Sequence, residues 1–177
     1  MRLSTSAINT FLRCSQLWDY TYIDKLEPVD SSGFEAAYGR AFHGLLEGDE
    51  ENLEHFGKKW QGVIKEHYHA YKKHWESDQH WTLDYFEQEL PFEFDLANGY
   101  TYHGIVDGVA ELNGANYLVE SKTTGWAIDD YIEKKEHVLQ PGLYLLAAQR
   151  SEQLAHYNIK GLIYDVTRRP TIRQKRG

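Results

Sequence analysis

Hydrophobic positions recur every third or fourth residue through the first part of the chain, which is typical of amphipathic helices. An opening helix is expected after Leu3, because Ser4 or Ser6 can accept hydrogen bonds from its first amides. The apolar stripe of this helix consists of Ile8, Phe11, Leu12 and Leu17. The chain is therefore predicted to begin with a helix that has one apolar face.

Two further helices are expected before the period changes. Residues 34–46 have a helical pattern, and Gly48 is the expected stop because glycine readily adopts the left-handed conformation after a helix. Residues 50–76 are very polar and suggest one long helix, either continuous or interrupted near Gly57 and Gly62.

The apolar period then changes to two, which indicates strands. Strands are predicted over residues 82–96, 100–112 and 115–121. The two connections carry Asn98-Gly99 and Asn113-Gly114, and Asn-Gly is a strong signal for a tight hairpin turn. The three strands should therefore form an antiparallel meander.

A helix and a last strand complete the pattern. Residues 129–149 are expected to be helical with a break near Gln140-Pro141, because proline fits best in the first turn of a helix. Residues 158–166 predict a final buried strand. This order of elements predicts an α/β fold, in which helices pack on a sheet.

The meander brings candidate catalytic groups together. If Leu112 pairs with Ala115 across the second turn, Asp107 faces Glu120, with their Cβ atoms about 4.5–5.5 Å apart. Two carboxylates at that distance repel each other, so a divalent cation between them is expected. Lys122 lies two residues beyond Glu120 and should point to the same face of the strand. Such a set suits phosphodiester hydrolysis.

The Glu-x-Lys tripeptide is weak as a signal by itself. Glu133, Lys134 and Lys135 repeat the pattern on a polar helix, where they suit a solvated face. A surface charge cluster is therefore an open alternative for Glu120 and Lys122, although they follow an apolar strand and face an aspartate. Gln140 and Tyr144 are four residues apart, so they share one helical face if Gln140 belongs to the helix. They would then bind a phosphate or line a cleft; in the alternative, Tyr144 packs with Leu143 and Leu145.

Composition limits the classes of protein. The 177 residues include 13 Tyr, 7 Phe and 5 Trp, which favours one folded domain. We expect a helical part over 1–80, a sheet core over 81–166 and a basic tail over 167–177. No apolar run is long enough for a bilayer, no signal peptide is apparent at the start, and Cys14 is the single cysteine, so an intracellular protein is expected.

The charge of the chain is uneven. A net charge of −8 argues against a general polyanion binder. The tail carries no acidic residue and the following bases: Arg168, Arg169, Arg173, Lys175 and Arg176. The tail is either a solvated, frayed terminus or an arm that contacts DNA.

Together these residues resemble the PD-(D/E)XK nuclease superfamily, in its RecB-like branch with CRISPR-adaptation nucleases and phage exonucleases. The resemblance covers nearly the whole chain and consists of short motifs in the family's order. They are the opening helix from Leu3 to Cys14, Gly39 to His43, Gly104 to Asp107, Val119 to Lys122, and Gln140 to Tyr144. The resemblance implies a restriction-endonuclease-like core with a central mixed sheet flanked by helices.

The resemblance also implies roles for single residues. Asp107, Glu120, His43 and the Ser121 carbonyl would hold Mg²⁺ or Mn²⁺. Lys122 would position the attacking water and stabilise charge on the phosphate. Gln140 and Tyr144 would orient the cleft and contact DNA, and Thr123 and Thr124 would contact phosphate.

The chain departs from many of these relatives in its cysteines. They carry an iron–sulfur cluster on four cysteines, whereas this chain has only Cys14, so no cluster is expected. The same comparison leads to the expectation that the chain ends before a C-terminal portion that these relatives have. We expect a DNA nuclease, more an exonuclease than an endonuclease, in recombination, repair or processing. Its expected partner is DNA, and no membrane partner is expected. A helicase, a single-strand-binding protein or a recombination protein as further partner, and a homo-oligomer, are compatible with the resemblance, and the sequence leaves the oligomeric state open.

Three alternatives stay open. The first is a catalytically inactive nucleic-acid-binding module on the same fold, although the chain retains the whole catalytic set. The second is an interaction protein that docks a partner through residues 50–76. The third is an enzyme of the same class that acts on RNA. A phage-encoded protein acting in the host cytoplasm is also compatible with the resemblance.

Overall fold

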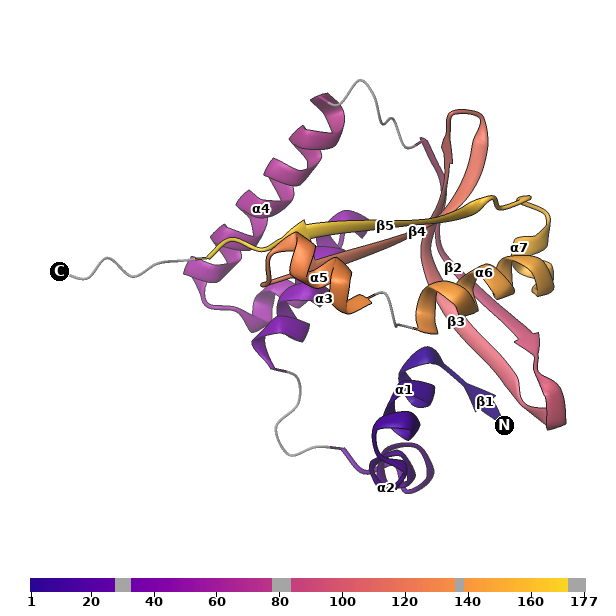
Figure 1. Ribbon diagram of the computed structural model, residues 1–177. Coiled ribbons are helices and arrows are strands. Elements are labelled where there is room, and N and C mark those ends of the chain that lie inside the picture. Colours follow the sequence, from indigo (N-terminus) through magenta and orange to yellow (C-terminus); the bar gives the residue numbers. More distant parts are fainter. Residues whose placement is uncertain (28–32, 78–83, 136–138, 172–177) are drawn as a thin grey trace. The chain divides into compact units, whose positions relative to one another are not determined.

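The computed structural model describes residues 1–27, 33–77, 84–135 and 139–171 (Figure 1). Its helical elements are α1 (Thr5–Arg13), α2 (Ser15–Trp18), η1 (Asp19–Ile23), α3 (Phe34–Glu47), η2 (Glu51–His55), α4 (Lys58–Ser77), η3 (Ala97–Gly99), α5 (Ile128–Lys135), α6 (Leu139–Arg150) and α7 (Glu152–Ala155). Its strands are β1 (Arg2–Leu3), β2 (Asp84–Asp95), β3 (Thr101–Leu112), β4 (Ala115–Thr124) and β5 (Gly161–Arg168). The predicted strand start at Thr82, the helical stretch 136–138 and most of the basic tail lie outside the described residues.

The strands form one mixed sheet, as predicted. Its order is β1-β3-β4-β5, with β2 paired to β3 as well. Strand β1 is parallel to β3, whereas the β2–β3 and β3–β4 pairs are antiparallel. Backbone bonds from Lys160 N to Asn116 O (2.8 Å) and from Arg169 N to Thr124 O (2.9 Å) join β5 to β4 in a parallel sense.

The two Asn-Gly turns confirm the predicted meander. Asn98 and Gly99 have φ angles of 61° and 75°, and Asn113 and Gly114 have φ angles of 53° and 76°. These positive φ angles match the right-handed twist of the flanking strands, and Asn and Gly tolerate them best. As predicted, Leu112 pairs with Ala115.

The chain divides into two compact units. The first consists of Met1–Ser31, Leu83–Glu120 and His137–Ile163, and the second of Ser32–Thr82, Ser121–Glu136 and Tyr164–Gly177. In the first unit, β2 and β3 form a long hairpin that α6 and α7 contact on β2 (Figure 1). The core of this unit is built around Tyr102, Val106 and Leu118, all fully buried.

The helical predictions hold in part. Ser4 caps α1 through a bond from Ala7 N, and Gly48 ends α3 with a φ of 83°, both as predicted. Only Ile8 of the predicted stripe packs against the core of the first unit; Phe11 and Leu12 are 52% and 67% exposed. Leu17 lies in α2, beyond the end of α1, so the stripe is correct as the pattern of one helix only as far as Leu12.

The polar segment after Gly48 is interrupted rather than continuous. A short 3-10 helix, η2, precedes α4, and Gly57 lies between them, whereas Gly62 lies inside α4. The buried side chains of α4 are Ile64 and His67, which lie in the interior of the second unit. No helix among the residues described has both the length and the apolar character to cross a membrane.

His67 is a buried hydrogen-bonding centre of the second unit. Its Nδ1 lies 2.9 Å from the Tyr38 hydroxyl and its Nε2 lies 2.9 Å from Thr167 Oγ1. The His67 ring is 8% exposed and packs against Phe42 at 4.6 Å between ring centroids. Burial lowers the pKa of His67, because it disfavours the charged imidazolium.

Acidification should therefore destabilise the protein through His67. Its folded pKa lies below that of the unfolded chain, so the stabilisation is complete above about pH 6.5 and is lost as the pH falls toward the folded value. The unfolding free energy of His67→Gln should fall less between pH 7.5 and pH 5 than that of the wild type. Urea unfolding at several pH values measures this, with exposed His69→Gln as the matched control. Equal pH slopes in the wild type and His67→Gln would contradict the prediction.

Candidate active site

Glu120 is a buried carboxylate near the end of the β3–β4 ladder. Its side chain belongs to β4 and is 2% exposed. Gln140 Nε2 donates to Glu120 Oε1 at 2.6 Å, and Glu120 Oε2 is also buried. A charge-assisted bond of this kind contributes roughly 1.5–3 kcal/mol, so Gln140 fixes the orientation of the carboxylate.

Tyr144 completes this arrangement on α6. Gln140 Nε2 also donates to the Tyr144 hydroxyl at 3.0 Å, and that hydroxyl donates to the Ile105 carbonyl at 3.0 Å. The ring packs edge to face with Phe92 at 5.4 Å, so Tyr144 both packs and bonds. Because Gln140 belongs to α6, the two side chains do share a helical face, as predicted. The structure therefore ties α6 to β3 and β4.

Asp107 lies on β3, next to Gly108, the last residue of that strand recorded as paired with β4. The β3–β4 pairs run from Leu112↔Ala115 to Gly108↔Val119, and the next pair in that register would be Asp107 with Glu120. Burial raises the pKa of Tyr144, and the negative charges of Glu120 and Asp107 raise it further. Both carboxylates therefore lie near one phenol, in the first unit.

His43 and Ser121 meet in the second unit. His43 Nε2 lies 2.9 Å from the Ser121 carbonyl oxygen, which brings together two of the predicted metal ligands. Gly39 lies close to the same strand, because a Cβ atom there would lie 3.3 Å from Thr123 Oγ1, which is a tight contact. In the Gly-x-x-x-His motif, the glycine lies about one helical turn before the histidine, so both Gly39 and His43 approach β4.

The residues after Glu120 continue β4 three positions beyond the predicted end at Ser121. Lys122 is half-buried and lies two residues from Glu120, so both side chains leave the same face of the strand. Thr124 is 6% exposed, and its Oγ1 accepts a bond from Trp126 N at 3.1 Å. Thr123 faces Gly39, so both threonines have structural contacts in the second unit.

Two contributions to this region come from residues of the motif Gly104 to Asp107 that were given no role of their own from the sequence. The Ile105 carbonyl is a backbone acceptor, which no residue pattern reveals. Gly104 pairs with Phe92 across the hairpin, and a Cβ atom at Gly104 would lie 2.8 Å from the Phe92 ring. Once the register of β2 and β3 is known, an aromatic residue opposite a glycine is a sequence signal that the ring lies over the glycine, and it could have identified this contact.

The side chains that could bind a metal do not form a cluster in the described ranges. Within residues 1–27, 33–77, 84–135 and 139–171, no three His, Cys, Asp or Glu side chains lie close enough together to hold an ion. Hard oxygen donors are nevertheless present in each unit, as the Glu120 and Asp107 carboxylates and as the Ser121 carbonyl. This donor chemistry suits Mg²⁺ or Mn²⁺.

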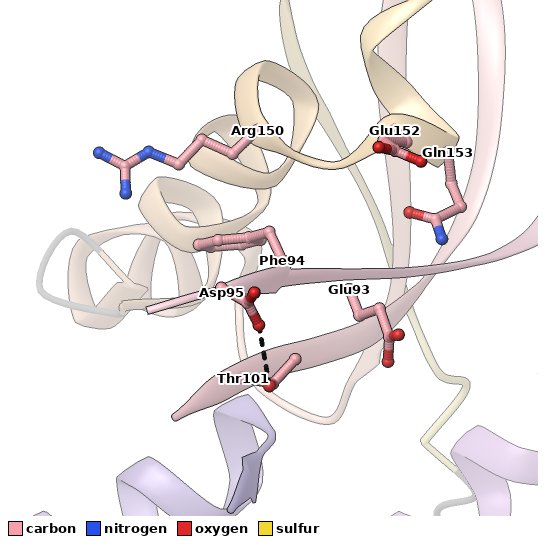
Figure 2. A pocket seen from close by; sticks show the side chains of 7 residues that line it. All are labelled: Glu93, Phe94, Asp95, Thr101, Arg150, Glu152 and Gln153. Carbon is pink, nitrogen blue, oxygen red and sulfur yellow. Dashed lines mark hydrogen bonds between the residues drawn. The ribbon is translucent and has the colours of Figure 1, made fainter. Parts of the chain in front are cut away.

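A pocket of about 260 Å³ occupies another part of the first unit (Figure 2). It is lined by Glu93, Phe94, Asp95, Thr101, Arg150, Glu152 and Gln153. Thr101 Oγ1 donates to Asp95 Oδ1 at 3.1 Å, and Glu93 pairs with Arg2. The lining contains three carboxylates and one guanidinium, so it is acidic. It contains none of the predicted site residues.

Comparisons with known proteins bear on the fold and on the family of the chain. A crystal structure from Eubacterium rectale, described as a "putative exonuclease", has a TM-score of 0.66 at 15% sequence identity over 96% of this chain and 69% of that chain, which shows a shared fold. No curated protein matches the sequence. A family model for the PD-(D/E)XK nuclease superfamily matches residues 2–176. The chain therefore belongs to the PD-(D/E)XK nuclease superfamily.

Proposed function

We propose that this nuclease is a deoxyribonuclease that depends on Mg²⁺ or Mn²⁺ and acts as an exonuclease. One observation carries the proposal: Glu120 is a buried carboxylate that Gln140 orients, next in register to Asp107. A protein gains no stability from bringing two carboxylates together in a poorly solvated place, unless a cation offsets their repulsion. The arrangement therefore favours a metal-dependent activity.

Asp107, Glu120, His43 and the Ser121 carbonyl are the proposed metal ligands. A bound divalent cation would supply Lewis-acid stabilisation of the phosphate and lower the pKa of a coordinated water. Gln140 holds Glu120 and is itself held by Tyr144, so these two residues keep the carboxylate in place. Lys122, on the same strand face as Glu120, would position the water and offset negative charge on the phosphate.

Thr123, Thr124, Gln140 and Tyr144 are the proposed substrate contacts. Polar groups of this kind commonly bind phosphate oxygens and fix the register of the strand. The resemblance of the sequence motifs to the RecB-like branch makes recombination, repair or DNA processing the proposed context, with a helicase, a single-strand-binding protein or a recombination protein as partner. We further propose action inside the cell, in the host cytoplasm if the gene is of phage origin, and a homo-oligomer of single-domain subunits.

Purified protein should degrade DNA when Mg²⁺ or Mn²⁺ is added and should lose this activity in EDTA. Linear and covalently closed circular DNA of the same sequence separate the two modes, because an exonuclease needs an end. Release of mononucleotides from linear DNA with intact circles supports an exonuclease, whereas nicked circles indicate an endonuclease. Cleavage of matched RNA alone would exclude DNA as the substrate, and binding without cleavage of either would indicate an inactive module.

A further inference from the structure

Arg169 begins the chain segment that follows β5, in the second unit. Its backbone N–H donates to the Thr124 carbonyl at 2.9 Å, which places it beside the end of β4. At about 3.3 Å per residue, Thr124 lies roughly 7 Å beyond Lys122 along the strand. That separation is on the scale of neighbouring phosphates of one strand, which lie farther apart than the axial rise of about 3.4 Å per step because the backbone winds around the helix axis.

Three contacts hold the Arg169 guanidinium in place. It forms an ion pair with Glu35 and lies 5.2 Å from the centre of the Phe34 ring. It also lies flat against Gly125, where a Cβ atom would be 2.7 Å from Nη2. The Arg169 side chain is only 19% exposed, whereas that of Glu35 is 64% exposed. The cation is therefore fixed, and its partner carboxylate lies toward solvent.

We propose that Arg169 is a substrate-binding residue that pairs with a backbone phosphate next to the one cleaved, a role that rests on the proposed nuclease function. A planar guanidinium binds phosphate oxygens in the same two-point geometry that it uses for a carboxylate. Glu35 then occupies the place of the phosphate in the free protein. The chain carries a net charge of −8, so attraction for a polyanion must come from such local cations.

A purely structural ion pair is the alternative, because Glu35 lies in the first turn of α3 and Arg169 follows β5. The two roles predict different results for Glu35→Gln. If the pair is structural, removal of either partner weakens the same link and has the same effect. If Arg169 binds phosphate, removal of Glu35 takes away a competitor, whereas removal of Arg169 takes away the site.

The experiment measures binding of a fluorescent single-stranded oligonucleotide in Ca²⁺, over a series of salt concentrations, together with the KM for cleavage in Mg²⁺. Arg169→Ala should weaken binding about 10-fold and reduce the slope of log affinity against log salt by about 1. Glu35→Gln should bind as tightly as wild type or several-fold more tightly. Arg150→Ala, which removes an exposed arginine of α6, is the matched control and should change neither value.

Thermal unfolding of each variant identifies any loss of folding, and Arg169→Lys provides a second variant with the charge retained. Binding by Arg169→Ala within twofold of wild type overturns the inference, and so does equal weakening in Arg169→Ala and Glu35→Gln. A wild-type protein that binds DNA through Arg169 but cleaves nothing would overturn the nuclease proposal while supporting this one.

Discussion

Lys122→Ala should lower the rate of DNA cleavage about 10³-fold while the protein remains folded. A positioned cation that offsets charge in the transition state, or that helps to orient the water, commonly accounts for 10²–10⁴-fold in rate. Lys122 lies two residues after Glu120 on β4, and side chains two positions apart on a strand share a face, which is the reason for this expectation. Single-turnover cleavage of an end-labelled oligonucleotide in Mg²⁺ measures the loss directly.

Affinity for DNA distinguishes a catalytic role of Lys122 from a general electrostatic one. A lysine that acts mainly in the transition state should change the KM or the Kd by only a few-fold when it is removed. Lys160→Ala is the matched control, because Lys160 is an exposed lysine that precedes β5 and its substitution removes the same charge. A rate within tenfold of wild type in Lys122→Ala would contradict the role proposed for Lys122.

Local sequence chemistry explains which parts of the fold were predictable. The Asn113-Gly114 turn fixes the pairing of its two strands by backbone preference, so the register from Leu112↔Ala115 to Gly108↔Val119 follows from the sequence. Gln140 and Tyr144 were likewise predictable as a pair, because helical spacing depends only on residues four positions apart.

Contacts between distant segments explain what was missed. Strand β1 has only two residues, and its parallel pairing with β3 depends on a partner about 100 positions away. Phe11 and Leu12 follow a helical period yet remain exposed, because periodicity identifies an apolar face but not what covers it. The approach of Gly39 to Thr123 is visible only after α3 and β4 are placed in the second unit.

Glu120→Gln should abolish cleavage, with a loss of 10³-fold or more, yet leave the metal-free protein as stable as wild type or more stable. The substitution keeps the size of the side chain, and its amide oxygen can still accept the bond from Gln140. It removes one of two neighbouring carboxylate charges from a poorly solvated place, which lowers their repulsion. The same charge is needed to bind a divalent cation.

Thermal unfolding with and without Mn²⁺ tests this second prediction independently of activity. An ion that binds only the folded wild type stabilises it by about 2.7 kcal/mol at 100 times its Kd, so the wild-type Tm should rise with Mn²⁺. Glu120→Gln should show little such rise. Glu111→Gln, an exposed carboxylate of β3, is the matched control and should behave as wild type. An equal rise in Glu120→Gln and wild type would show that Glu120 is not a metal ligand, because the binding energy would then survive without its charge.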